Sequence, residues 1–230
     1  MITSALPTWI LHKRWVRDTS VQITFLTEEE GLLQALYRGG RSLKKKPLIQ
    51  EFMPLWVSLN KRGEHVYVQQ LEASAPSLQL KGHALFAALY TNELLCLLLH
   101  PSSELNRELF ALYTSTLYAL AKASQRLQIE AILRCFEWKF LSLSGYQVSL
   151  EHDNAMRPIV ADKRYNFLAG SGFFAEKEGI SGEHILAFAQ NKFNDAATLK
   201  SIKWFMRQAI DYALDGKPLR TRKLYLNSPS

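Results

Sequence analysis

The spacing of apolar residues changes once along the chain, near residue 80, from a period of two to the period of a helix. Before this point apolar and polar residues alternate, as in Val21, Ile23 and Phe25, which is typical of half-buried strands. After it, apolar residues recur three and four positions apart, as on one face of a helix. This pattern predicts a sheet domain followed by a helical domain, an α+β, multidomain architecture.

The first part of the chain contains five strand-like runs with no helical run between them. The runs cover residues 9–17, 20–27, 32–38, 52–60 and 64–71, and glycines stand in turns between them. Five short antiparallel strands favour a small closed barrel, of which the OB-fold is the commonest five-stranded form. A sheet with open edges is the alternative, although closure better protects so small an apolar face. We therefore expect an OB-fold domain over residues 1–79.

The remaining residues, 80–230, predict an α-helical domain. Helical spacing covers about 85–99, 105–120, 129–141, 181–190 and 199–213, and Asp195 is a suitable N-cap for the last run. The spacing fails between 150 and 180, where Gly170 and Gly172 mark turns. We expect a short hairpin insertion near 160–178, with strands at 164–167 and 172–175.

Residues able to carry out catalysis show no recognisable arrangement. The six histidines do not fall at metal-ligand spacing, and there is no Walker loop, nucleophile elbow or dinucleotide motif. Cys96 and Cys135 are the two cysteines, and they offer neither a disulfide framework nor a structural zinc site. The most apolar window, 84–99, is too short to span a membrane, and the N-terminus does not resemble a signal peptide. We expect a cytoplasmic protein that is not an enzyme and that uses no metal, cofactor or membrane.

A dense basic cluster follows the third predicted strand. The formal net charge is +7, and five cations fall within nine residues without one acid: Arg38, Arg41, Lys44, Lys45 and Lys46. They occupy a Gly-Gly loop expected to form a flexible arm, and Arg14 and Arg17 would widen the patch. OB barrels bind single strands through strands 2 and 3 and the adjoining loops. The cluster therefore predicts nucleic-acid binding, with a merely solvated loop as the alternative. Trp15 and Tyr37 are either base-stacking residues or core residues.

A second basic cluster lies near the C-terminus. Lys200, Lys203 and Arg207 recur at helical spacing, and Arg134 belongs to the third predicted helix. Cations beside apolar helical faces favour a receptor for a short acidic peptide that ends in hydrophobic residues. A solvated helix surface is the alternative interpretation.

Short stretches spread over nearly the whole chain carry a family resemblance. They read Trp-Ile-Leu-His-Lys-Arg at 9–14, Asp-Thr-Ser at 18–20, Phe-Leu-Thr-Glu-Glu-Glu-Gly at 25–31, Arg-Gly-Gly-Arg-Ser at 38–42, Tyr-Thr-Asn-Glu-Leu-Leu at 90–95, Arg-Cys-Phe-Glu at 134–137 and Gly-Lys-Pro-Leu-Arg-Thr-Arg-Lys-Leu at 216–224. Their order and spacing together resemble the RecO family of recombination mediators. The resemblance implies an N-terminal OB domain followed by a helical domain.

The resemblance also implies a function in DNA repair by the RecFOR route. RecO proteins bind single- and double-stranded DNA, anneal complementary strands and act with RecR. They also contact the acidic C-terminal tail of the single-stranded-DNA-binding protein, SSB, and help RecA to load on SSB-coated DNA. We therefore expect DNA, RecR and the SSB tail as partners, and a cytoplasmic, nucleoid-associated location.

Matching positions carry the family's residue roles onto this chain. Arg38, Arg41 and Lys44 would contact DNA. The SSB tail would be held by Arg134, Lys203 and Arg207, with Leu94, Leu98 and Phe136 lining a hydrophobic pocket. Some RecO proteins hold zinc with cysteines in the segment corresponding to 150–180, where this chain has none, so the resemblance implies a zinc-free hairpin and no cofactor. A general RNA-binding OB-fold protein is the alternative function, because it would share the basic barrel.

Overall fold

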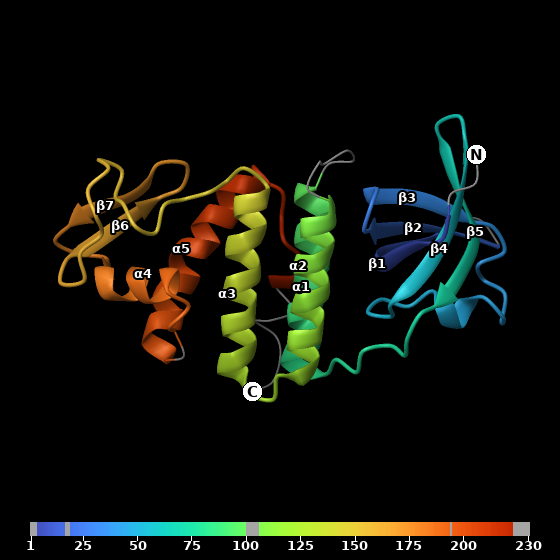
Figure 1. Ribbon diagram of the computed structural model, residues 1–230, viewed down its shortest axis with the longest axis horizontal. Coiled ribbons are helices and arrows are strands. Elements are labelled where there is room, and N and C mark those ends of the chain that lie inside the picture. The colour runs from blue at the N-terminus through green and yellow to red at the C-terminus, as the bar shows by residue number, and fades with distance from the viewer. Residues whose placement is uncertain (1–3, 17–18, 100–105, 194, 223–230) are drawn as a thin grey trace. The chain divides into compact units, whose positions relative to one another are not determined.

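Residues 4–16, 19–99, 106–193 and 195–222 are described by the computed structural model of the chain (Figure 1). Five strands come first and helices dominate the rest, as the change in apolar spacing predicts. The chain divides into two compact units, the first holding residues 1–121 with 219–230 and the second holding 122–218. These units are not the domains expected from the sequence, and the domain boundary near residue 79 stays a prediction.

A closed barrel is formed by the first five strands (Figure 1). They are β1 (Leu6–Val16), β2 (Ser20–Thr27), β3 (Gly31–Tyr37), β4 (Leu55–Arg62) and β5 (His65–Ala73). The order around the barrel is β1-β2-β3-β5-β4, and β4 pairs with β1 to close it. Neighbouring strands are antiparallel except β3 and β5, which are parallel. The OB-fold prediction is thus confirmed, and the alternative of an open sheet is wrong.

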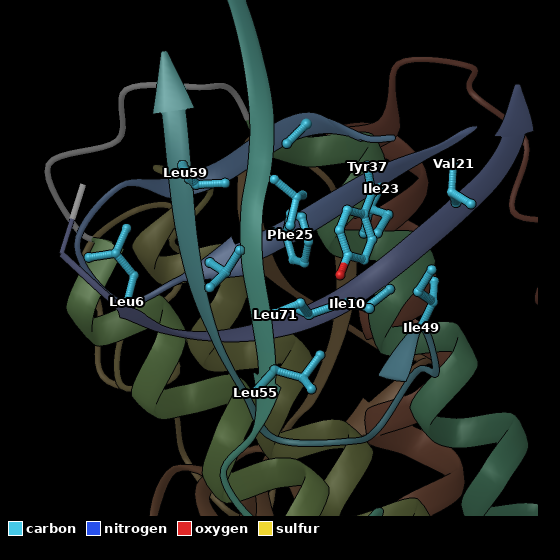
Figure 2. Packing of buried hydrophobic residues seen from close by; sticks show 13 residues of the cluster. Leu6, Ile10, Val21, Ile23, Phe25, Tyr37, Ile49, Leu55, Leu59 and Leu71 are labelled. Carbon is cyan, nitrogen blue, oxygen red and sulfur yellow. The ribbon is translucent and has the colours of Figure 1, made fainter. Parts of the chain in front are cut away.

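The barrel is filled by the residues that the alternating pattern marks as apolar. Val21, Ile23 and Phe25 of β2 are fully buried, as their period of two predicts. They belong to a cluster of thirteen buried residues from all five strands and from the loop after β3. Figure 2 shows these side chains pointing into the space that the strands enclose. A single continuous core therefore fixes the register of the strands.

Five helices and a small sheet follow the barrel in the described residues. The helices are α1 (Gly82–Leu98), α2 (Asn106–Lys122), α3 (Arg126–Leu143), α4 (Gly182–Ala189) and α5 (Ala196–Leu214). The sheet consists of β6 (Arg164–Leu168), β7 (Gly172–Glu176) and β8 (Ile180–Ser181). β6 and β7 form the predicted hairpin, whereas β8 is too short to show a period in the sequence. Of the described helices, none is both long and apolar enough to cross a membrane.

Buried hydrogen bonds join α1 and α2 to the barrel within the first unit. The Asn92 side-chain amide of α1 donates to the Leu11 carbonyl of β1 over 3.0 Å, and its oxygen accepts from the Tyr113 hydroxyl of α2. The Trp9 indole nitrogen donates to the Thr114 hydroxyl over 2.9 Å. Because Asn92 and Tyr113 are both buried, these bonds replace the water that each polar group gave up on folding.

Four phenylalanine rings hold the second unit together. They come from β6, β7, α4 and α5. Phe167, Phe173 and Phe205 contact one another, and Phe188 contacts Phe205, at centroid distances of 5.1–5.9 Å. α5 begins as predicted, because the Asp195 carboxylate accepts from the Thr198 backbone N–H over 2.8 Å. The hydrogen bonds that Asp195 accepts, above all from Thr198, also lower the pKa of its carboxyl. The ring cluster and the cap fix the position of α5 within its unit.

Replacing Tyr113 with Phe tests the network between α1, α2 and the barrel. The ring stays buried, but the Asn92 side-chain oxygen loses its hydroxyl donor. We expect the free energy of unfolding to fall by about 1–3 kcal/mol, the cost of leaving a buried acceptor without its partner. Urea denaturation followed by circular dichroism measures the change.

Tyr118 provides the matched control, because its side chain is 40% exposed on the same helix. Tyr118→Phe should change the free energy of unfolding by less than about 0.5 kcal/mol. Equal losses in both variants would show that the buried hydroxyl has no special role.

Candidate nucleic-acid interface

The basic loop between β3 and β4, residues 38–50 and hereafter the cationic loop, is folded back on the barrel. The Arg41 N–H donates to the Thr19 carbonyl over 3.2 Å, and the Lys46 N–H to the Ser42 carbonyl over 2.9 Å. A 3₁₀ helix, η1 (Lys46–Leu48), follows these turns. The expectation of a flexible arm was therefore wrong, because the backbone of the loop is hydrogen-bonded to itself and to the barrel.

Side-chain contacts attach the end of the cationic loop to the barrel. Ile49 is 2% exposed and belongs to the barrel core (Figure 2). The Lys13 ammonium group of β1 donates to the Ile49 carbonyl over 3.0 Å and to the Glu51 carboxylate over 2.8 Å. Gly40 lets the loop pass close to β2, since a Cβ there would lie 3.0 Å from Val21 Cγ2. The cations are therefore presented at a fixed place beside the strands.

Three cations of the loop lie over aromatic rings of the barrel. The distances from cation to ring centroid are 4.6 Å for Arg38 over Tyr67, 5.3 Å for Arg41 over Trp15 and 4.5 Å for Lys45 over Tyr37. The negative face of each ring attracts the cation without neutralising it, unlike a carboxylate. Burial raises the pKa of Tyr37, so its phenol stays neutral beneath Lys45. The three cations are thus positioned while they remain charged toward an incoming anion.

The register of the strands explains why these rings lie beside the loop. Two adjacent rows of cross-strand partners run over the barrel, one through Trp15, Val21 and Tyr37 and the next through Arg14, Gln22, Leu36 and Tyr67. Successive residues of a strand face opposite sides of a sheet, so the rows face opposite ways. Trp15 and Tyr37 continue the inward-facing row of Val21, whereas Tyr67 shares the outward-facing row of Arg14. The cations of the loop contact both rows.

The other cations predicted to contact DNA are exposed, except one that lies outside the described residues. Lys44 and Lys46 are exposed. Arg14 is also exposed, and its guanidinium donates to the Gln22 side-chain oxygen over 2.7 Å. Arg17 lies outside the described residues. Of the seven predicted residues, Arg14 and the five cations of the loop therefore lie on or beside β1, β2 and β3.

Shallow hollows open between these side chains. One of about 290 Å³ is lined by Trp15, Arg41 and Lys46. Another of about 140 Å³ includes Arg38, Arg62 and Tyr67 in its lining. Arg62 and Tyr67 were missed from the sequence, because only the pairing of β5 with β3 brings them beside the loop. The sequence places Tyr67 in the fifth predicted strand and Arg62 in the turn before it, and neither position indicates a neighbour in the loop.

Two of the residues predicted to hold an acidic tail are exposed on α5 in the second unit. Arg207 is exposed, and Lys203 is 52% exposed with its ammonium group 3.7 Å from the Glu130 carboxylate of α3. Trp204 lies between them in the sequence and is 45% exposed. Trp204 cannot be recognised as exposed from the sequence, because it directly precedes the buried Phe205 and belongs to an apolar run. An exposed ring flanked by two cations suits an acidic peptide with a hydrophobic end.

The remaining predicted tail-binding residues are buried or half-buried in their own units. Arg134 of α3 is buried, and its guanidinium pairs with the Glu137 carboxylate at 2.7 Å. Phe136 is 1% exposed, and Leu94 of α1 is fully buried. Leu98 is half-buried. The two leucines belong to the first unit and the α3 residues to the second, so these four do not form one site within either unit.

The described residues offer little for catalysis. Among them, no three His, Cys, Asp or Glu side chains gather as a metal site requires. Burial, with a further contribution from Glu93, raises the pKa of Cys96 to about 11, and burial also raises the pKa of Cys135. Both thiols are therefore protonated near neutral pH, which makes them poor nucleophiles. The chemistry that this surface supports is the binding of anions.

Comparison with known proteins identifies a family whose two models together match nearly the whole chain. The family model described as Recombination protein O N terminal matches residues 1–76, and the one described as Recombination protein O C terminal matches residues 79–223. The chain belongs to the RecO family. The family resemblance seen in the sequence is thus confirmed, and with it membership of a family of DNA repair proteins.

Two relatives show how far the likeness to the RecO family extends. The DNA repair protein RecO of Legionella pneumophila (strain Paris) is 43% identical over 227 residues, which cover 98% of this chain and 99% of the relative. The DNA repair protein RecO of Coxiella burnetii (strain RSA 493 / Nine Mile phase I) is 36% identical over 95% of this chain and 96% of the relative. The likeness therefore covers both the barrel and the helices.

Replacing Ile49 with Ala tests the anchor of the cationic loop. The substitution leaves a cavity in the barrel core, so we expect the free energy of unfolding to fall by about 2–4 kcal/mol. Leu43, in the same loop and 92% exposed, is the control, and Leu43→Ala should leave stability unchanged. Urea denaturation measures both variants. A loop that does not contribute to the core would give the same small effect at both positions.

Proposed function

We propose that this chain is a DNA repair and recombination mediator that binds single- and double-stranded DNA through the barrel and the cationic loop. The observation that carries the proposal is the array of five cations beside β1, β2 and β3, three of which lie over aromatic rings, with no acidic residue between 38 and 50. Lys and Arg bind the phosphate backbone and supply most of the affinity for DNA of any sequence. The relatives named DNA repair protein RecO support DNA as the ligand.

Annealing of complementary strands follows from the same charges. When cations neutralise phosphates on two strands, the repulsion between the strands falls and their bases can pair. The protein then acts stoichiometrically, because base pairing supplies the product and no covalent bond is made or broken. The proposal gives no residue a catalytic role and requires no cofactor. It places the protein in the cytoplasm with the nucleoid, without a membrane partner.

On SSB-coated DNA, the proposed second contact is the acidic C-terminal tail of SSB on α5. Lys203 and Arg207 would pair with its carboxylates, and the exposed ring of Trp204 would meet its hydrophobic end. Arg134 and Phe136, which belong to α3, would support α3 and α5 from the interior. Simultaneous binding of the tail and of DNA raises the local concentration of each for the other. With RecR, as the family resemblance implies, this arrangement promotes RecA loading.

Reversing three charges of the cationic loop tests the DNA interface. In Arg38→Glu/Arg41→Glu/Lys44→Glu, we expect affinity for a single-stranded oligonucleotide to fall at least about tenfold, because phosphate contacts are replaced by repulsion. If the unsubstituted chain neutralises five phosphates, log K should fall with log salt at a slope of about −3.5. Fluorescence anisotropy at several KCl concentrations measures both quantities. Unchanged affinity of the variant, or binding that ignores salt, would contradict the proposal.

The control for this experiment is charge reversal on α5. Lys203→Glu/Arg207→Glu should weaken binding of a labelled SSB tail peptide and leave oligonucleotide affinity unchanged, whereas the loop variant should do the reverse. Loss of both ligands in either variant would reject the assignment of two separate sites. Tighter binding of a structured RNA than of DNA would instead favour the general RNA-binding alternative.

A further inference from the structure

Two aromatic rings at the edge of the barrel are partly exposed beneath guanidinium groups. Trp15 is 41% exposed and Tyr67 is half-buried. Arg41 lies over Trp15 and Arg38 over Tyr67. Both kinds of planar group, aromatic rings and guanidinium groups, stack against unpaired nucleobases.

The surroundings of Trp15 combine apolar surface with positive charge. The hollow lined by Trp15, Arg41 and Lys46 adjoins a larger one of about 400 Å³, whose lining adds Leu43 and Pro47 to Trp15 and Lys46. Leu43 is 92% exposed, so its apolar side chain is open to an incoming ligand. A nucleotide needs this combination, with an apolar face for its base and a cation for its phosphate.

We propose that Trp15 and Tyr67 are stacking platforms for unpaired bases, an assignment that rests on the proposed DNA-binding function. Without nucleic acid, Arg41 and Arg38 occupy the ring faces. When a single strand binds, the guanidinium groups turn to its phosphates and bases take their places on the rings. The exchange is favourable because stacking of a base on an aromatic ring is stronger than an exposed cation–π contact.

The platforms make the interface respond to whether DNA is paired. Bases in a duplex are stacked on their neighbours, so their faces are not available to Trp15 and Tyr67. The cations bind phosphates of either form, but the two rings add affinity only for single strands. Tyr37 has no such role, because it is 4% exposed and its ring belongs to the barrel core.

The test compares single-stranded and duplex oligonucleotides of equal length at one salt concentration, by fluorescence anisotropy with the full chain. Trp15→Leu keeps an apolar side chain on β1 but removes the ring. Single-strand affinity should fall about tenfold while duplex affinity changes less than twofold. Trp15→Phe, which restores a ring, should recover most of the loss, and Tyr67→Leu and Tyr67→Phe should behave in the same way. Circular dichroism confirms that each variant is folded.

Trp56 of β4 is the matched control. Its side chain is also 41% exposed, but its cross-strand partner is Glu72 of β5, whose carboxylate would repel phosphate. Trp56→Leu should leave both affinities unchanged. A further variant, Arg41→Leu, should lower single-strand and duplex affinity together, because it removes a phosphate contact.

The possible outcomes separate this inference from the function on which it rests. Equal losses of single-strand and duplex affinity in Trp15→Leu would overturn the stacking role and leave Trp15 as a support for Arg41. If neither Trp15→Leu nor Tyr67→Leu lowered single-strand affinity, the stacking role would be overturned as well. If the charge-reversed loop variant bound DNA as well as the unsubstituted chain, the proposed interface itself would fail. A selective loss of single-strand affinity in the Leu variants, recovered in the Phe variants, would support both the stacking role and the proposed DNA interface.

Discussion

The burial of Ile49 in the barrel core is the contact on which the candidate interface depends. Five like charges in nine residues repel one another, so a loop of this composition is expected to extend into water. Ile49 holds the end of the loop in the barrel, and the pairing of Lys13 with Glu51 fixes the residues beside it. Because three of the cations then rest on rings rather than on carboxylates, the array keeps its charge. Burial of one apolar residue thus holds the positively charged loop against the barrel.

The two candidate surfaces are built on separate cores. The barrel core and the network around Asn92 support the cationic loop in the first unit. The phenylalanine cluster and the Asp195 cap support α5 in the second. The two surfaces share no residue, so charge-reversing substitutions can be made in each one separately. The array of cations beside the barrel strands supports the proposal of DNA as the first ligand, and the exposed Trp204 beside two cations supports the proposal of an acidic peptide as the second.

Local patterns in the sequence predicted the elements that depend on local physics. Alternation along β2, the Asp195 cap and the hairpin at β6 and β7 all follow from neighbouring residues, and the structure confirms each. Contacts between segments that are far apart in the sequence could not be predicted from it. Nothing near Tyr67 indicates that the parallel pairing of β5 with β3 places it under Arg38. Helical spacing also could not distinguish the buried Arg134 from the exposed Trp204, because each adjoins an apolar position and a small rotation decides which faces water.

Lysine acetylation, read by mass spectrometry with and without a single-stranded oligonucleotide, shows whether bound DNA covers the cationic loop. We expect Lys44 and Lys46 to lose reactivity when the oligonucleotide binds, because phosphates cover their ammonium groups. Lys192 and Lys203, exposed in the second unit, should react at the same rate in both conditions. Protection confined to the second unit, with the cationic loop as reactive as before, would show that DNA does not bind at the loop.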